Sequence, residues 1–159
     1  MAKAKYPLEK LLELREKRVD EAVSSLAGAV RVRETAEQAK ARAEAEKRAA
    51  EEAAERLRKA ETAALEEGTL SVADLQRGHA GELRVETEQQ ALARHVEAAT
   101  QKTDAARAAE SAAQQELGQK KGDAKVVTED RSRFVERERR TALAKEEEEA
   151  AEAWRPKGR

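Results

Sequence analysis

Two histidines and many carboxylates are the side chains in this sequence that could bind a metal or move protons. His79 and His95 lie 16 residues apart, which places them about 160° apart around a helix, so they cannot share one metal ion. Carboxylates would need a desolvated site to take separate acid and base roles, and solvated helices do not provide one. The sequence has no cysteine, no HExxH motif and no phosphate-binding glycine loop. We therefore expect no catalysis, no cofactor and no metal.

Three arginines near the end of the chain have a spacing that suits binding rather than catalysis. Arg133, Arg137 and Arg140 stand at i, i+4 and i+7, so a helix would place them on one face. Such a face is either simply solvated or docks on an acidic or carbonyl-lined surface. The glutamate run 146–149 that follows is typical of a solvating segment. Trp154, the only tryptophan, either fills a partner's pocket or stays free.

The composition indicates long helices instead of a compact core. Charged residues make up 41% of the chain, the net charge is −1, and the apolar residues include 35 Ala, 13 Leu and 10 Val with no Ile. That apolar volume is too small for a globular core to offset chain entropy. No apolar run is long enough for a signal sequence or a membrane span, and mixed charges with few aromatics argue against nucleic-acid binding. We expect a cytoplasmic protein without direct membrane insertion.

One interruption divides the helix-forming sequence near its middle. Gly68 can take the positive φ of a helix C-cap, and Ser71 with Asp74 forms the start of a new helix. Pro7 suits the first turn of the first helix, and Pro156 ends the second. The sequence thus predicts a first helix over about 7–66, a turn over about 67–71, a second helix over about 72–154 and a tail over 155–159.

A heptad-like apolar seam runs along the first predicted helix. Steps of four and three residues lead from Leu8 to Ala64 through 17 positions, of which 12 are apolar. A seam of this kind needs a partner helix. The polar exceptions are Arg15, Arg33, Lys40, Lys47 and Glu61.

The second predicted helix has a poorer seam, from Val85 to Phe134. A short loop between long helices makes them antiparallel neighbours. We therefore predict an all-α fold, a long antiparallel two-helix coiled-coil hairpin in a single elongated domain, with residues from about 132 to 154 as an overhanging C-terminal helical extension. The polar interruptions of this seam are Gln89, Thr103, Glu110, Lys120 and Arg131.

Several apolar residues near the paired chain ends do not fit the seam. Leu11 and Leu14 point away from the stripe of Leu8 and Leu12, Val135 lies about 80° from the stripe of Phe134, and Leu143 lies nearly opposite it. These residues suggest a surface for a further partner. The alternatives are a frayed end or a contact for self-association.

The N-terminal segment YPLEKLLELREKRVDEA, the two helix lengths and the basic-then-acidic end resemble the FliJ/YscO family, the stalk proteins of type III secretion and flagellar export ATPases. This resemblance spans the chain in architecture. In residues it is carried by Pro7, Leu8, Leu11, Leu12, Leu14, Arg15, Asp20, Glu21 and Ala22.

The resemblance implies a noncatalytic adaptor that inserts its terminal end into a hexameric secretion ATPase and promotes ring assembly. It also implies contact with the cytoplasmic domain of the export gate, binding of secretion chaperones, and a place in the cytoplasm peripheral to the inner-membrane secretion apparatus. By position, the gate-binding residues would be Leu75, His79 and Leu83, in a stretch that Gly78 and Gly81 interrupt. The ATPase-binding residues would be Leu8, Leu11, Leu12, Leu14, Arg15, Arg133, Phe134, Arg137 and Arg140.

Two other interpretations of the sequence remain. The chain is a freestanding coiled-coil scaffold or chaperone that self-associates through the same weak seam, or it is one isolated salt-bridged helix that does not fold back. The sequence does not distinguish a flagellar from a virulence-type secretion system.

Overall fold

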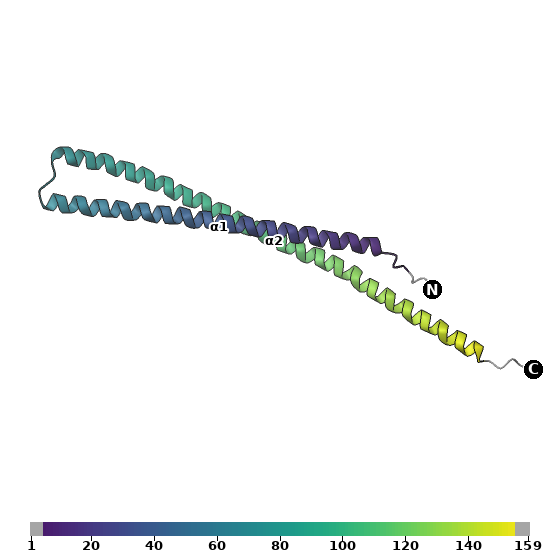
Figure 1. The fold of residues 1–159 in the computed structure, drawn as a ribbon. Coiled ribbons are helices and arrows are strands. Elements are labelled where there is room, and N and C mark those ends of the chain that lie inside the picture. Colours follow the sequence, from purple (N-terminus) through teal and green to yellow (C-terminus); the bar gives the residue numbers. More distant parts are fainter. Residues whose placement is uncertain (1–4, 155–159) are drawn as a thin grey trace, which may run out of the picture. The chain divides into compact units, whose positions relative to one another are not determined.

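The computed structural model describes residues 5–154, so the expected tail at 155–159, with Pro156, lies outside the described residues. Two long helices, α1 (Glu9–Glu66) and α2 (Val72–Ala153), account for nearly all of this part of the chain, and it contains no strand (Figure 1). The all-helical prediction is confirmed. Each helix begins and ends within two residues of the position expected from its proline, glycine or serine signal.

The turn between α1 and α2 is built from backbone hydrogen bonds. Gly68 has φ 69° and donates to the Leu65 carbonyl at 3.1 Å, while the Thr69 N–H donates to the Ala64 carbonyl at 3.1 Å. This pair of bonds is a Schellman motif, which satisfies carbonyls that the end of α1 would leave free. Only glycine takes this positive φ without strain, so Gly68 ends α1.

α2 begins with a capping box at Ser71 and Asp74. The Asp74 N–H donates to Ser71 Oγ at 3.2 Å, and the Ser71 N–H donates to Asp74 Oδ2 at 2.9 Å. Each residue thereby satisfies a backbone donor of the other. The Ser71 hydroxyl also donates to Asp74 Oδ2 at 2.5 Å, and this bond is the main cause that lowers the pKa of Asp74 to about 2; the bond from the Ser71 N–H and the neighbouring Arg77 add to the effect.

The chain divides into two compact units, which are described separately. Within the described residues, the first unit comprises 5–27 with 112–154 and the second comprises 28–111. Each unit contains one part of α1 and one part of α2. No helix in the described residues is both long enough and apolar enough to span a membrane.

Burial follows the predicted seams closely in both units. On α1 every seam position from Leu12 to Ala64 except Leu57 is buried or half-buried. On α2 every seam position from Val85 to Phe134 except Arg131 is also buried or half-buried. The polar seam residues are included, because Thr103 is the most deeply buried large side chain and Arg33 is half-buried. The periodicity therefore identifies the covered face of each helix.

Candidate partner-binding surfaces

The first unit has a small apolar core beside the start of α1. Tyr6, Leu12 and Val127 are buried together, and Leu11 and Phe134 pack against them half-buried. The rings of Tyr6 and Phe134 have centroids 5.4 Å apart and planes tilted by 56°, a favourable aromatic geometry. These five side chains join the N-terminal segment to α2.

Tyr6 also makes polar contacts that hold it in this core. Its hydroxyl donates to Asp130 Oδ2 at 2.7 Å and lies 3.4 Å from the Val127 carbonyl oxygen. Burial raises the pKa of Tyr6 to about 12, with further contributions from the hydrogen bond to Asp130 and from its negative charge. Tyr6 is therefore protonated under ordinary conditions and acts as a donor.

Two ion pairs connect α1 and α2 in the same unit. Arg15 Nη1 lies 2.7 Å from Asp123 Oδ2, and Arg131 Nη2 lies 3.1 Å from Glu9 Oε1. All four side chains are partly exposed, so these pairs orient the helices more than they stabilise them.

The nine residues expected to bind an ATPase differ in exposure. Leu12 is only 3% exposed, so its side chain belongs to the core and offers no surface. Leu11 was expected to point away from the seam, and this is wrong because it packs against that core. Leu8 was expected in the seam but is 42% exposed, because it precedes α1 and Tyr6 takes the buried position at this end. Arg15 and Phe134 are half-buried, and the exposed members are Leu8, Leu14, Arg133, Arg137 and Arg140.

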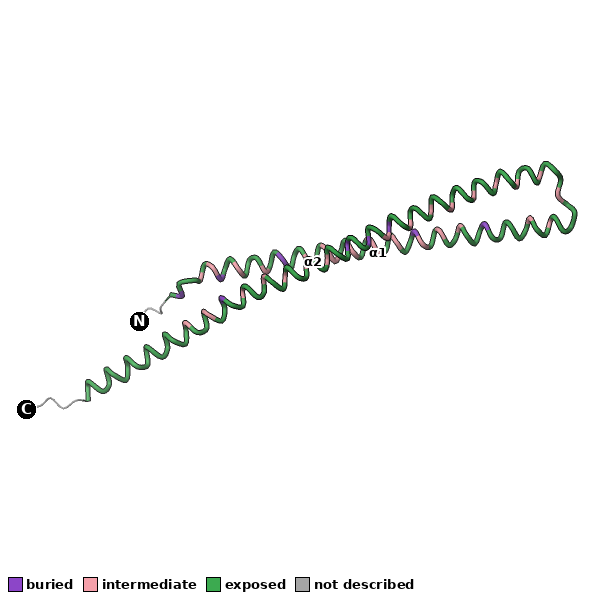
Figure 2. The backbone as a smooth tube through the Cα atoms, turned by 180° about the vertical axis from the view of Figure 1, so that it is seen from behind, coloured by how far each residue is buried: buried purple, intermediate pink, exposed green. Residues whose placement is uncertain are grey.

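Beyond Phe134, α2 is exposed on every side to its end (Figure 2). Val135 is 57% exposed and Leu143 is 50% exposed, as the helical spacing predicted. Among the described residues, no carboxylate forms an ion pair with Arg133 or Arg137, whereas Arg140 pairs with Glu136 one turn away. Residues 133–154, the last part of α2 with Trp154 after it, thus present free guanidinium groups and apolar side chains together, and we name this segment, in which only Phe134 is half-buried, the exposed arm.

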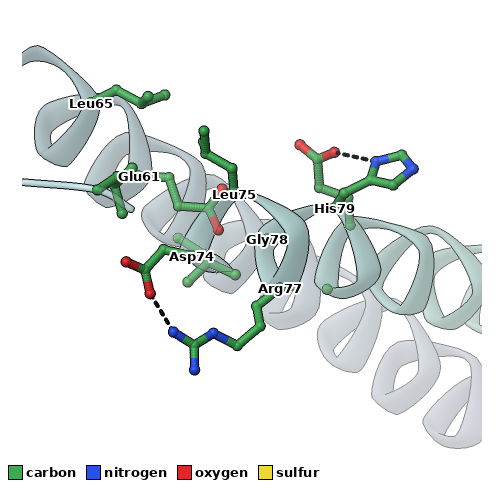
Figure 3. A pocket seen from close by; sticks show the side chains of 11 residues that line it. Glu61, Leu65, Asp74, Leu75, Arg77, Gly78 and His79 are labelled. Carbon is green, nitrogen blue, oxygen red and sulfur yellow. Dashed lines mark hydrogen bonds and ion pairs between the residues drawn. The ribbon is translucent and has the colours of Figure 1, made fainter. Parts of the chain in front are cut away.

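The second candidate surface is a groove beside the turn, in the second unit. An open groove of about 490 Å³ is bordered by both helices, and Figure 3 shows its labelled side chains. Of the three predicted gate-binding residues, Leu75 and His79 line the groove while Leu83, 54% exposed, does not. We name this site the turn groove; its apolar lining comes from Leu57, Leu65, Leu70 and Leu75.

Gly78 and Gly81 leave the α2 side of the turn groove open. A Cβ atom at Gly78 would lie 3.5 Å from Glu61 Oε1, an ordinary contact, so the Glu61 carboxylate already lies against this position. Among the described residues Glu61 makes no ion pair, while Asp74 pairs with Arg77 (Figure 3). The groove thus combines leucine side chains with the Glu61 carboxylate, which no cation among the described residues pairs, and with Glu82, whose carboxylate lies 3.8 Å from His79 Nδ1.

Several of these residues were not singled out from the sequence. Tyr6 was overlooked although it stands directly before Pro7, where an apolar residue preceding a helix often packs back on it. Leu65 and Leu70 were overlooked because they flank the turn and fall outside the seam. No group of three or more His, Asp or Glu side chains in residues 5–154 is arranged to hold a metal ion.

Comparison with known proteins assigns the chain to a family. A family model described as YscO-like protein matches residues 3–154. No curated protein and no solved structure gives a significant match. Because the family model covers nearly the whole sequence, the resemblance seen in the N-terminal segment is confirmed, and the chain belongs to the YscO-like family.

Proposed function

We propose that this chain is a noncatalytic stalk and adaptor subunit of a type III protein secretion apparatus. It inserts the end formed by the start of α1 and the exposed arm into a hexameric ATPase, promotes assembly of the ring and couples the ring to the export gate. Membership of the YscO-like family supports the link to secretion. The single observation that carries the ATPase contact is the exposed arm.

The proposal includes an antiparallel coiled-coil hairpin, which the contacts within each unit support. In the first unit Glu9 contacts Arg131 whereas Arg15, later in α1, contacts Asp123, earlier in α2. In the second unit Arg33 pairs with Glu110. Glu37, one turn further along α1, pairs with the earlier Arg107. Partner numbers that rise on one helix and fall on the other are the pattern of antiparallel packing.

The exposed arm has the chemistry expected of a segment that enters a protein pore. Arg133 and Arg137 can make planar, bidentate hydrogen bonds to carboxylates or carbonyl groups of a surrounding ring. Val135 and Leu143 supply apolar contacts, and Leu8 and Leu14 add exposed apolar surface in the same unit. A two-helix element lacks sixfold symmetry, so nucleotide hydrolysis around the ring can change which contact is favoured.

The turn groove is the proposed contact with the cytoplasmic domain of the export gate. Leu75 and His79 border it, and Leu83 follows on α2. Binding there would leave the exposed arm free for the ATPase, so one chain would contact both. Secretion chaperones are further proposed partners. The proposed location is the cytoplasm, peripheral to the inner-membrane secretion apparatus.

The test is ring assembly and ATP turnover of the cognate ATPase in the presence of the chain. The wild type should raise both, while the variant Leu14→Asp, Arg137→Glu should reduce the stimulation by about tenfold or more, as loss of hot-spot contacts does. Both side chains are exposed, so the variant should retain its helical circular dichroism.

The matched control is Val32→Asp with Arg94→Glu, which changes an exposed apolar residue and an exposed arginine in the second unit. It should stimulate the ATPase as the wild type does. If the wild type changes neither assembly nor turnover, the stalk proposal is wrong and the freestanding coiled-coil scaffold is favoured.

A further inference from the structure

A group of four charged side chains joins α1 to α2 within the second unit. Arg33 Nε lies 2.5 Å from Glu110 Oε2, and Arg33 Nη1 lies 2.7 Å from Glu37 Oε2. Glu37 in turn accepts two hydrogen bonds from Arg107, at 2.9 and 3.1 Å. Every charge in this group therefore faces an opposite charge, and two of the three residue pairs cross between the helices.

A buried hydroxyl lies on the same stretch of the seam. Thr103 is 1% exposed, and its Oγ1 lies 2.9 Å from the Ala99 carbonyl oxygen and 3.2 Å from the Ala36 carbonyl oxygen. The Ala36 contact crosses to the other helix. We name Thr103 together with the four charged residues the polar layer; its members are Arg33, Glu37, Thr103, Arg107 and Glu110.

The apolar contacts around the polar layer do not select one alignment of the helices. Alanines recur at intervals of seven on α1, at 29, 36, 43 and 50, and on α2 at 99 and 106. A shift of one helix by one heptad would replace alanine by alanine along this stretch. Each position buries little more than a methyl group, worth under about 1 kcal/mol, so the shifted and observed alignments bury similar apolar surface.

The polar layer does distinguish these alignments. After a one-heptad shift, Arg33 would face Thr103 or Leu117 in place of Glu110, and neither residue can neutralise a half-buried guanidinium group. Glu110, whose side chain is only 18% exposed, would face Leu26 after the first shift and lose its partner, whereas after the second shift it would face Lys40 and only Arg33 would be left unpaired across the helices. Leaving a partly buried charge unpaired is costly, and a single polar seam position is known to fix the register of coiled coils.

We propose that the polar layer is a register lock, which holds α1 and α2 of the second unit in one alignment that their alanine contacts leave undetermined. The proposal rests on the antiparallel hairpin of the proposed function. It goes beyond that function because it assigns a role to residues that the proposed ATPase and gate contacts do not use.

Two exposed alanines in the second unit provide label positions for the test. The sequence has no cysteine, so Ala45→Cys and Ala109→Cys can carry two nitroxides for electron–electron distance measurement. In the hairpin the labelled backbone sites should lie roughly 20 to 30 Å apart, whereas one continuous helix would place them about 96 Å apart. The wild-type distance therefore tests the hairpin before any variant tests the lock.

The test variant replaces the lock by apolar residues, Arg33→Leu, Glu110→Leu and Thr103→Ala. Leucines in the seam should preserve or raise the thermal midpoint, since apolar residues often stabilise where buried ion pairs stood. The distance distribution should gain a second population shifted by about 10 Å, the length of one heptad. A single population at the wild-type distance would overturn the proposal.

Two further variants make the result specific. Lys47→Leu with Glu51→Leu removes an ion pair that lies within α1 alone, and it should keep one distance. Arg33→Gln with Glu110→Gln preserves size and polarity but removes the charges, and it should show the shifted population even if the triple variant fails to fold. A single wild-type distance in this glutamine variant would likewise rule out the lock.

Discussion

The hydroxyl of Tyr6 donates a 2.7 Å hydrogen bond to the carboxylate of Asp130, a residue 124 positions later in the chain. Tyr6 is buried beside Leu12, Val127 and Phe134, and this core sits where the exposed arm begins. The position of the arm relative to α1 therefore depends on one aromatic side chain that precedes the first helix.

The titration of Tyr6 gives the first prediction. Its pKa is raised to about 12 from an ordinary value near 10, so the stability it contributes is complete below about pH 10 and is lost as the pH rises through about 12. The chain has one tyrosine, so tyrosinate absorbance near 295 nm reports this group alone. Asp130→Asn removes the charge but keeps an acceptor. It should lower the midpoint of the Tyr6 titration without restoring it to about 10, because burial remains. A midpoint near 10 in the folded wild type would contradict the buried geometry.

The start of α2 gives the second prediction. The pKa of Asp74 is lowered to about 2 by hydrogen bonds from Ser71, so its stabilising effect is present above about pH 4 and is lost as the pH falls through about 2. Ser71→Ala should raise the pKa of Asp74 toward its ordinary value and reduce stability by about 1 kcal/mol. Carboxyl carbon chemical shifts measure the pKa, and urea unfolding measures the stability. Ser111→Ala, an exposed change inside α2, should leave the Asp74 pKa where it is.

The polar layer gives a third prediction, in acid. The hydrogen bond from Arg107 is the largest influence that lowers the pKa of Glu37, and Arg33 adds to it. Glu37 therefore contributes stability above the ordinary glutamate pKa, about 4.3, and this contribution is lost as the pH falls through the lowered value. Arg107→Gln should move the Glu37 pKa back toward the ordinary value, as carboxyl chemical shifts can follow. Arg94→Gln changes an arginine without an ion pair among the described residues. An equal shift of the Glu37 pKa in this variant would refute the role assigned to Arg107.

The turn groove gives a fourth prediction, on binding of the purified cytoplasmic domain of the export gate. Leu65→Asp places a charge in the apolar lining and should weaken binding by about tenfold or more, as titration calorimetry would detect. Val72→Asp alters a nearby apolar residue that is 74% exposed and does not line the groove, so this variant should bind normally. Leu83→Asp changes an exposed residue outside the groove, so comparing it with Leu65→Asp distinguishes binding in the groove from binding on the outer face of α2. If Leu83→Asp weakens binding more than Leu65→Asp does, the gate contact lies on the outer face of α2 and not in the groove.

Local signals in the sequence predict the elements of this fold well. Gly68 and Ser71 with Asp74 act through backbone geometry and hydrogen bonds between near neighbours, so the turn can be derived without knowing any distant contact. Heptad spacing likewise predicts which face of each helix is covered, polar residues such as Thr103 included.

Contacts between distant residues were harder to predict. Periodicity defines a face but not the axial alignment of two helices, so Arg33 and Glu110 looked like separate flaws in two seams when they in fact pair with each other. Helical angles also failed at the start of the chain. Tyr6 precedes α1, where those angles do not apply, and its ring changes which of Leu8 and Leu11 is covered.

The single tryptophan gives the exposed arm a built-in optical reporter. Trp154 directly follows the end of α2 and is 88% exposed, and the chain has no second indole to obscure its signal. In the free protein the fluorescence of Trp154 should resemble that of a fully hydrated indole. Burial of this side chain by a binding partner would shift the emission to shorter wavelength and protect the indole from quenching by iodide. The natural sequence thus allows the burial of this terminus to be followed in real time without attaching a dye.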